Sequence, residues 1–506
     1  MTRPRFNPSP CKGSDATTLQ FDQTSLSWTP IVSCPADFPP ELFELAVSQL
    51  THHPEYNSTL ILRSEVIEES AEVFPVSVPL LRGLRPVRNT HRRLLPRRPT
   101  RDSGLEQHCT LYAPSHPSGP DAFHPTVLVL TPILPSDGSL PYYYPTVTHL
   151  AFRIIPPTSS ESAVLRMEAL PLPGTPLDQG GRLYRTCLSL LETLHRYGWG
   201  TLTHYKKRVL HDVLLPRETY QDLYLIMRER YKHLIDDWHE VTDPLKHVFE
   251  DIGIATFLML LWKDTYGPET IPPLPVDSTG LANEPSRHWP RPPGGFVDLG
   301  CGNGLLTHIL VSEGYAGHGF DLRSRTSWAH YPPATQSRLL RNGADDGQTT
   351  ATTARTLLPA DCFLIGNHAD ELTPWVPLLA TRVRASGYLS IPCCAWGLDA
   401  RFDRARDVPR CDVDAETLNL GAGGEGAWSS YALYRAWLAS LSVHCGWAVE
   451  VEMLRIPSTR NWAIVGRKRV GSSEEADDNV EELIEGVRKR GQFKTRRPEG
   501  KAGGDH

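Results

Sequence analysis

Apolar runs bounded by polar and proline-rich stretches mark the first third of the chain. They predict strands near residues 60–67, 127–134 and 147–154, so we expect an α+β region over residues 1–180. Between the first two runs, residues 82–101 hold arginines, prolines and a histidine but no acidic residue. This composition predicts a flexible basic arm, which either contacts nucleic-acid phosphates or remains a solvated loop.

After residue 180 the spacing of apolar residues becomes that of helices. Apolar residues recur every three or four positions at 182–195, 220–238 and 242–262, predicting a helical region over 181–266 that packs on the next domain. Aromatic residues at this spacing indicate a buried face more often than a base-stacking platform. In the second helix they are Tyr220, Tyr224, Tyr231 and Trp238. The third helix begins with polar turns, which we expect near the glycine motif described next. Their polar residues are Lys246, His247, Glu250 and Asp251.

Residues 296–310 read Phe-Val-Asp-Leu-Gly-Cys-Gly-Asn-Gly and continue into an apolar run. This pattern predicts a strand, a tight turn and a helix. Gly300, Gly302 and Gly304 permit positive φ angles and close approach to a ligand at the helix N-terminus. A second predicted strand ends in Asp321, where a carboxylate would meet ribose hydroxyls. These features together predict an α/β sheet that binds a nucleotide-type ligand.

The glycine spacing selects among such ligands. A dinucleotide fingerprint needs G-x-G-x-x-G, but Leu305 or Thr307 occupies the third glycine position, which disfavours a dehydrogenase. Asp298 would repel a pyrophosphate and suit the ammonium of an amino acid. The pattern resembles motif I of class I S-adenosylmethionine (SAM) methyltransferases. The resemblance implies a Rossmann-like doubly wound sheet that binds SAM; the alternative is a glycine turn in an unrelated α/β fold.

A buried strand predicted at 362–365 runs into Asn367, His368 and Asp370. Ligands of open α/β sheets bind at the carboxyl ends of strands, so these side chains fall where substrate meets cofactor. We expect further strands around 388–396 and 456–466, a helix from 428 and a polar loop over 337–356.

Composition sets wider limits. The 506 residues imply two or three domains: a proline- and glycine-rich linker at 267–295, a catalytic core at 296–470 and a charged, disordered tail at 471–506. The net charge of −6 does not indicate that the protein as a whole attracts nucleic acid. The sequence has neither a signal peptide nor a membrane-length apolar run, so we expect a cytoplasmic protein.

The ten cysteines follow no zinc or disulfide spacing, and we expect no metal. One group of cysteines and a histidine could suggest a metal site, but we interpret its members as small buried side chains. Its members are Cys393, Cys394, Cys411, His444 and Cys445.

Several blocks, together with the glycine motif, resemble the eukaryotic tRNA (uracil-O(2)-)-methyltransferases. They are Tyr-Lys-Lys-Arg-Val at 205–209, Thr-Asp-Pro-Leu-Lys-His-Val-Phe-Glu-Asp-Ile at 242–252, Gly-Asn-His-Ala-Asp-Glu-Leu at 366–372, Ile-Pro-Cys-Cys at 391–394 and Pro-Ser-Thr-Arg-Asn-Trp at 457–462. The resemblance covers roughly residues 205–469 and implies SAM-dependent 2′-O-methylation of uridine 44 in serine tRNA. One departure, at 397–402, weakens any role for Arg401.

Roles for individual residues follow less directly. The expected cofactor-binding residues are Asp298, Gly300, Gly302, Gly304, Asp321 and Asn367. No lysine occurs at 366–375 or 391–399, so the candidate general base is His368 or Asp370, unless both only shape the turn or contact SAM. A basic cluster is the candidate RNA contact, although a solvated helix end is the more common explanation of such a run. It comprises Lys206, Lys207, Arg208 and Arg217. Methylation at another RNA position, and a non-catalytic RNA-binding scaffold, remain as alternatives.

Overall fold

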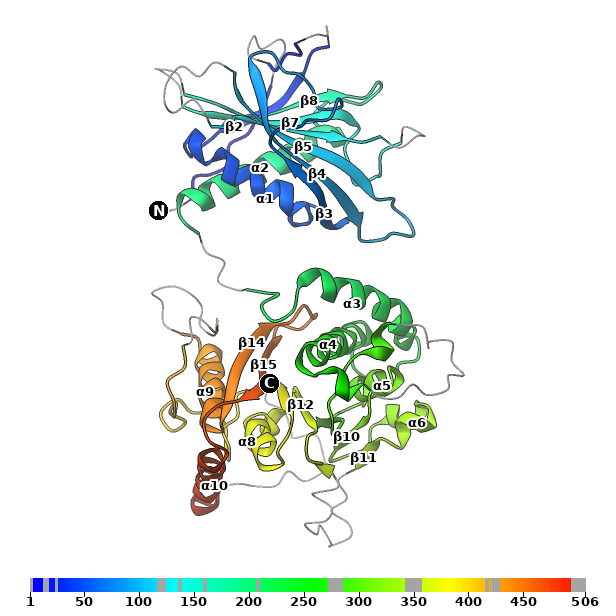
Figure 1. Cartoon of the computed structure of the whole chain (residues 1–506), viewed down its shortest axis with the longest axis vertical. Coiled ribbons are helices and arrows are strands. Elements are labelled where there is room, and N and C mark those ends of the chain that lie inside the picture. Colours follow the sequence, from blue (N-terminus) through cyan, green and yellow to red (C-terminus); the bar gives the residue numbers. More distant parts are fainter. Residues whose placement is uncertain are drawn as a thin grey trace. The chain divides into compact units, whose positions relative to one another are not determined.

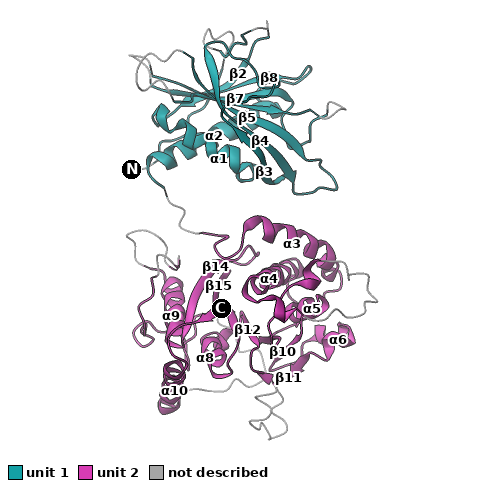
Figure 2. Ribbon diagram, viewed as in Figure 1, with its two compact units in different colours: residues 1–206 teal, residues 207–506 magenta. Residues whose placement is uncertain are grey.

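The computed structural model describes residues 3–11, 18–22, 26–115, 124–134, 139–157, 162–205, 210–271, 285–341, 357–414, 418, 420 and 428–492. The chain divides into two compact units, residues 1–206 and 207–506 (Figure 2). In the described part, no helix combines the length and apolar character needed to cross a bilayer.

The first unit is an eight-stranded antiparallel sheet with two helices on one face (Figure 1). Its strand order is β1-β2-β8-β7-β6-β5-β4-β3. The strands are β1 (Ser9–Pro10), β2 (Thr29–Pro35), β3 (Ile61–Ser70), β4 (Leu84–Pro96), β5 (Leu105–Pro114), β6 (Val127–Pro132), β7 (Val147–Ile155) and β8 (Val164–Pro171). Helices α1 (Phe43–His52) and α2 (Arg182–Leu202) share a core with alternate strand residues such as Leu150, Phe152 and Ile154. This is the α+β arrangement expected for the region.

The flexible basic arm expected at 82–101 is wrong, because residues 84–96 form β4 between β3 and β5. Its charges are matched by groups on other elements. Arg92 is 2% exposed and donates to Gln107 of β5 and to the Leu50 carbonyl of α1. Arg93 pairs with Glu106. These partners are distant in sequence, so the local charge run gave no sign of them.

The predicted packing of helix 182–195 on the following domain is also wrong. Helix α2 buries Leu183, Cys187, Leu191 and Leu194 in the core of the first unit, and that unit extends to residue 206. Helical periodicity identifies the apolar face of a helix but not the surface that covers it. The domain boundary was therefore placed too early.

The second unit is built on a seven-stranded sheet of order β11-β10-β9-β12-β13-β15-β14. The strands are β9 (Phe296–Leu299), β10 (Gly317–Asp321), β11 (Leu339–Arg341), β12 (Phe363–Asn367), β13 (Gly387–Ile391), β14 (Trp447–Met453) and β15 (Trp462–Arg469). The first five are parallel, and β15 runs antiparallel to both β13 and β14. Strand β11 occupies part of the loop expected at 337–356, of which 342–356 lie outside the described residues.

Helices cover both faces of this sheet (Figure 1). One layer contains α3 (Arg217–Tyr231), α4 (Pro244–Thr265) and α5 (Leu305–Ser312), and α6 (Pro333–Gln336) contacts α5. The other contains α8 (Trp375–Arg382), α9 (Ser430–His444) and α10 (Ser473–Arg490). The buried Tyr220 and Tyr231 confirm the core reading of the aromatic stripe.

The disordered tail expected at 471–506 is wrong for residues 473–490, which form α10. Its acidic residues face outward, while apolar side chains at helical spacing enter the core with α8 and α9. These side chains are Ala476, Val480, Leu483 and Val487. High charge masked a periodic apolar face, and residues 493–506 lie outside the described part.

The direction of strand addition reverses at β9. From β9 the chain adds β10 and then β11 on one side, and then adds β12 and β13 on the other. Such a reversal opens a crevice at the carboxyl ends of the two central strands. Here these ends are Leu299 of β9 and Asn367 of β12, with Ile365 paired in register with Asp298.

Candidate active site

The glycine motif forms the turn between β9 and α5. Gly300, Gly302 and Gly304 have φ angles of 70°, 56° and 76°, in the left-handed region where glycine carries no steric penalty. A Cβ at Gly302 would meet nothing within 4 Å, whereas one at Gly304 would lie 2.8 Å from Leu339. The turn is therefore packed at its end and open at its middle.

Two side chains hold this turn in place. Asp321, at the carboxyl end of β10, accepts the Gly302 N–H at 3.0 Å on one oxygen and the Arg323 N–H at 3.1 Å on the other. Trp328 Nε1 donates to the Gly302 carbonyl at 2.9 Å. Each Asp321 oxygen keeps a lone pair that is able to accept a ribose hydroxyl.

Asp298 lies beneath the turn and is 2% exposed. Its carboxylate accepts the Thr307 hydroxyl of α5 at 3.0 Å. Burial raises the pKa of Asp298 to about 7; the Thr307 hydrogen bond opposes this shift and the charge of Asp321 adds to it. A buried carboxyl without a cationic partner in the described part of the chain is suited to a positively charged ligand.

Helix α4 brings two further carboxylates to the same crevice, in agreement with the expectation for its polar turns. Asp251 Oδ1 accepts the Asn367 side-chain amide at 3.4 Å. Burial, together with the charges of Glu250 and Asp298, raises the pKa of Asp251 well above its usual value. The Oδ1 atom of Asn367 is buried and has no hydrogen-bond partner among the described residues. An unused acceptor thus faces an acidic crevice.

His368 and Asp370 follow β12 with φ angles of 50° and 45°, conformations that strain residues other than glycine. The His368 N–H bonds to the Ile391 carbonyl at 3.1 Å, which fixes this backbone against β13. His368 Nε2 lies 3.1 Å from Glu250 Oε1. A carboxylate partner assigns the proton to Nε2 and leaves Nδ1 as a base.

The sequence predicted that Glu250 lies near the glycine motif but assigned it no role. It is 4% exposed, and His247 Nδ1 lies 4.0 Å from its other oxygen. Burial acts to raise the pKa of Glu250, but the hydrogen bond and charge of His368 outweigh it and leave the pKa lowered. An ionised Glu250 beside His368 is the arrangement of a base with its orienting acid.

Asp370 points to a different partner. Its Oδ1 lies 3.4 Å from Cys393 Sγ, and potential ligand atoms of Asp370, Cys393 and Cys394 lie within 4.8 Å of one another. Burial, then Asp370 and Cys394, raise the pKa of the Cys393 thiol. No fourth histidine, cysteine or carboxylate joins this group in the described part of the chain. Cys411 Sγ and His444 Nδ1 lie 3.9 Å apart, outside it.

Comparison with known proteins agrees with this architecture. A family model described as a TRM44-like, N-terminal bet v1-like domain matches residues 8–208. A second, described as a predicted AdoMet-dependent methyltransferase, matches 214–275 and 289–344. A tRNA (uracil-O(2)-)-methyltransferase of Neurospora crassa is 33% identical over 90% of this chain and 89% of its own length. Proteins of that name from Schizosaccharomyces pombe and Saccharomyces cerevisiae are 34% and 30% identical, covering 88% and 84% of this chain and 86% and 84% of their own lengths.

The chain belongs to the tRNA (uracil-O(2)-)-methyltransferase family. Its cofactor is S-adenosylmethionine. The crevice fits that molecule, which carries an ammonium and a sulfonium but no phosphate. Asp251, Asp298 and Asp321 supply carboxyl groups, and Asn367 supplies a free acceptor. Burial raises the pKa of Asp251 and Asp298, and a bound cation would favour their ionised form. The same acids would repel a dinucleotide pyrophosphate, which is why the dehydrogenase reading fails chemically as well as in glycine spacing.

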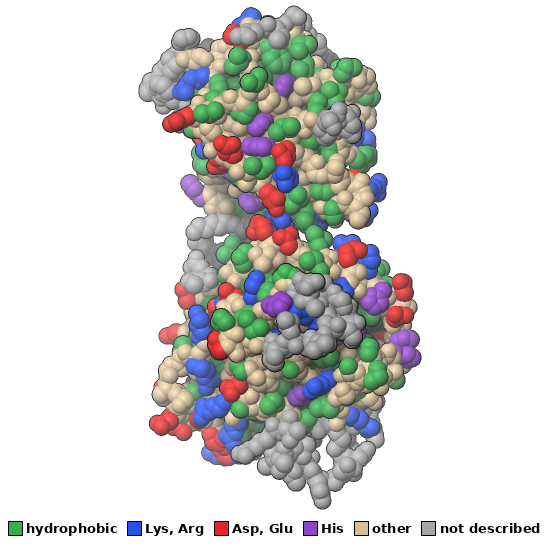
Figure 3. Space-filling view, turned by 45° about the vertical axis from the view of Figure 1, so that its right-hand side comes forward, with side chains coloured by type: hydrophobic (Ala, Val, Ile, Leu, Met, Phe, Trp, Pro, Cys, Tyr) green, Lys and Arg blue, Asp and Glu red, His purple; other side chains and the backbone are tan. Residues whose placement is uncertain are grey.

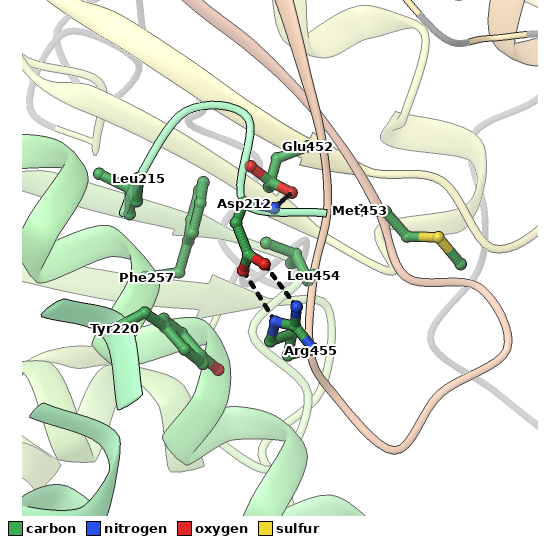
Figure 4. Close-up of a pocket in the computed structure, with 8 residues that line it drawn as sticks. All are labelled: Asp212, Leu215, Tyr220, Phe257, Glu452, Met453, Leu454 and Arg455. Carbon is green, nitrogen blue, oxygen red and sulfur yellow. Dashed lines mark hydrogen bonds and ion pairs between the residues drawn. The ribbon is translucent and has the colours of Figure 1, made fainter. Parts of the chain in front are cut away.

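Of the four residues expected to contact RNA, the structure describes only Arg217. Lys206, Lys207 and Arg208 lie outside the described residues, and Arg217 is the half-buried first residue of α3. The intervening segment is clamped to the end of β14 (Figure 4). Glu452 accepts the backbone N–H groups of Asp212, Val213 and Leu214 at 2.7–2.9 Å, and Arg455 pairs with Asp212 through both carboxylate oxygens.

Proposed function

We propose that this chain transfers a methyl group from SAM to the ribose 2′-OH of uridine 44 in serine tRNA. Three observations support the proposal: membership of the family, an acidic crevice suited to SAM, and a histidine base beside it. The pairing of His368 with the buried Glu250 carries the argument, because it places a proton acceptor at the carboxyl end of β12.

We further propose that the second unit is the Rossmann-like sheet of class I SAM methyltransferases. The strand order supports this, since it reverses at β9 and the polar groups gather at the crevice so formed. The groups that we assign to SAM lie in the β9–α5 turn and at the ends of β10 and β12. They are Asp298, Gly300, Gly302, Gly304, Asp321 and Asn367.

Bound SAM supplies an electrophilic methyl carbon on its sulfonium. The chain must align the ribose oxygen with that carbon and accept its proton. We assign the proton to His368 Nδ1, because Nε2 is engaged by Glu250. Glu250 orients the imidazole and stabilises the imidazolium that forms. Asp370, the other candidate, contacts the Cys393 thiol and is the weaker assignment.

We retain Lys206, Lys207, Arg208 and Arg217 as proposed RNA contacts. The clamp on Glu452 supports this, because it fixes the chain just after the lysines to β14, whose carboxyl end lies at the catalytic edge. We also propose a cytoplasmic location. All ten cysteines belong to the described part and none forms a disulfide, as expected for a reducing compartment.

Incubation with tritiated SAM and serine tRNA that lacks the modification, followed by nucleoside mapping, tests the function. The proposal expects label in 2′-O-methyluridine. Label in a methylated base would indicate a different reaction. Binding of tRNA without incorporation would indicate a non-catalytic scaffold, and 2′-O-methylation of another nucleotide would retain the chemistry but reject the position.

A further inference from the structure

Arg435, in the second turn of α9, is a buried cation without an acidic partner among the described residues. It is 6% exposed, and its guanidinium lies 3.7 Å from the centroid of the Trp462 ring and 5.1 Å from that of Tyr431. Its Nη2 donates to the Leu420 carbonyl at 2.8 Å. In the described part of the chain, Nε and Nη1 are buried and unpaired. Buried charges are normally paired, so this one needs an explanation.

A second guanidinium shares the same tyrosine. Arg460, in the loop between β14 and β15, lies 3.9 Å from the Tyr431 centroid and is exposed. Burial is the main cause that lowers the pKa of Arg435 to about 10; Tyr431 opposes this shift and the charge of Arg460 adds to it. Arg435 still carries its charge at neutral pH. No carboxylate of the described residues contributes to this balance.

This pair lies at the catalytic edge of the sheet. Tyr431 donates its hydroxyl proton to the Pro392 carbonyl at 2.7 Å, directly after β13. Strand β13 neighbours β12, and Ile391 accepts the His368 N–H. Trp462 begins β15, the next strand beyond β13. The arginines therefore lie on the β13–β15 side of His368, away from the β9 and β10 strands that carry Asp298 and Asp321.

The edge is thus divided by charge. Its β9–β10 side and α4 carry carboxylates suited to a cationic cofactor, whereas its β13–β15 side carries two guanidiniums. Elsewhere, on the face drawn in Figure 3, acidic and basic side chains of the described residues are interspersed. The two guanidiniums are therefore a local candidate for binding a polyanion near the reaction centre. Guanidinium is the side chain best matched to phosphate oxygens.

We propose that Arg435 and Arg460, arranged around Tyr431, bind a phosphodiester group of the RNA strand that carries the target nucleotide. The inference rests on the proposed function for the identity of the RNA but not for the chemistry of the site. Arg460 is the exposed member of the pair and Arg435 the buried one. The N–H groups on Nε and Nη1 of Arg435 are the donors that a phosphate would satisfy.

The test measures the affinity of the full chain for unmodified serine tRNA over a series of salt concentrations. We expect Arg460→Ala and Arg435→Met each to weaken binding about ten-fold, the loss for one charged hydrogen-bonded contact. The slope of log affinity against log salt becomes less steep by about 1 for each. Arg382→Ala, an exposed arginine paired with Glu481, is the matched control and leaves both quantities unchanged.

If Arg435 had a purely structural role, the opposite effects on melting temperature and tRNA affinity would be expected. Arg435→Met would then lower the melting temperature and leave tRNA affinity unchanged. Under our proposal the melting temperature stays equal or rises, because a buried unpaired cation is removed, while tRNA affinity falls. SAM affinity, measured by calorimetry, stays unchanged in both arginine variants and shows that the catalytic unit is folded.

Two further measurements distinguish a failure of the phosphate site from a failure of the proposed function. One arm compares poly-glutamate with an RNA of equal charge as competitors for the site. If poly-glutamate competed equally well, the ligand would be an acidic peptide rather than RNA, and the proposal would be overturned. Wild-type methylation is measured in parallel. Normal methylation with unchanged tRNA binding by both variants rejects the phosphate site alone. Loss of binding in the variants, with no methylation by the wild type, rejects the proposed function and supports the site.

Discussion

His368 Nε2 lies 3.1 Å from the carboxylate of Glu250, a residue 118 positions earlier in the chain. The turn after strand β12 supplies the histidine and helix α4 supplies the acid, so the pair forms only when the helix packs on the sheet. His368 itself has a left-handed backbone, with a φ angle of 50°. The geometry of this pair is therefore tied to the packing of α4.

Replacement of His368 by alanine should lower the rate of methyl transfer by about 10²–10⁴-fold, the usual contribution of a general base. SAM affinity should be unchanged. Single-turnover assays at saturating SAM measure the step. The His368→Ala, Asp370→Ala double variant is the decisive case: transfer at the wild-type rate would show that neither residue is the base.

Glu250→Gln should have a smaller effect, because Glu250 acts through His368. The amide keeps the shape but loses the charge that stabilises an imidazolium. We expect a lower rate of methyl transfer with unchanged SAM affinity. The two single effects should not add in the double variant with His368→Ala. Effects that add would leave Glu250 a packing role only.

Asp298 should make the stability of the fold depend on pH. Its pKa is about 7 in the folded chain and near 3.9 when unfolded, so the folded state holds the proton more tightly. Its contribution is present at low pH and is lost as pH rises from about 4 through 7. Asp298→Asn should therefore melt at a higher temperature than wild type at pH 8, and at a similar temperature at pH 5, without SAM. A difference independent of pH would contradict this. The stabilisation that SAM gives the wild type should be reduced in the variant.

The sequence could indicate which residues gather around the β9–α5 turn because the signals for them are local. The alternating glycines, Asp298 and Asp321 all lie within one strand–turn–helix–strand segment. The polar residues after β12 were likewise placed by a single apolar run. The pairing of His368 with Glu250 was not predictable, since it joins elements more than a hundred residues apart.

The errors have the same physical origin. Arg92 and Arg93 suggested a solvated arm because their partners, Gln107 and Glu106, come from β5. Arg435 gave no signal in the sequence, because an arginine inside an apolar helix shows neither its burial nor the absence of an acid nearby. For α10 the apolar period was present but was outweighed by its charge.

The clamp formed by Glu452 should contribute strongly to stability. Its buried carboxylate accepts three backbone N–H groups, which lose this acceptor when the side chain is truncated. We expect Glu452→Ala to destabilise the second unit by about 3 kcal/mol and to increase protease cleavage near residues 205–215. Glu482→Ala, on the exposed face of α10, is the control. Equal melting temperatures for the two variants would contradict the assignment.

Two glycines of α2 offer an internal comparison in the first unit. A Cβ at Gly198 would overlap the ring of Phe38, whereas one at Gly200 would meet only Tyr205 Cβ at 3.9 Å. Gly198→Ala should destabilise by about 1–3 kcal/mol through overpacking. Gly200→Ala should stabilise by about 0.5–1 kcal/mol through helix propensity. Hydrogen exchange of α2 amides measures both, and equal effects would show that α2 does not pack closely on Phe38.

A single atom of the substrate tests the central claim most directly. Serine tRNA is prepared with 2′-deoxyuridine in place of uridine at position 44, and methyl incorporation from tritiated SAM is compared with that of the unaltered tRNA. The account predicts that incorporation disappears while tRNA binding is retained, because the accepting oxygen is absent. Equal incorporation into both tRNAs would contradict it.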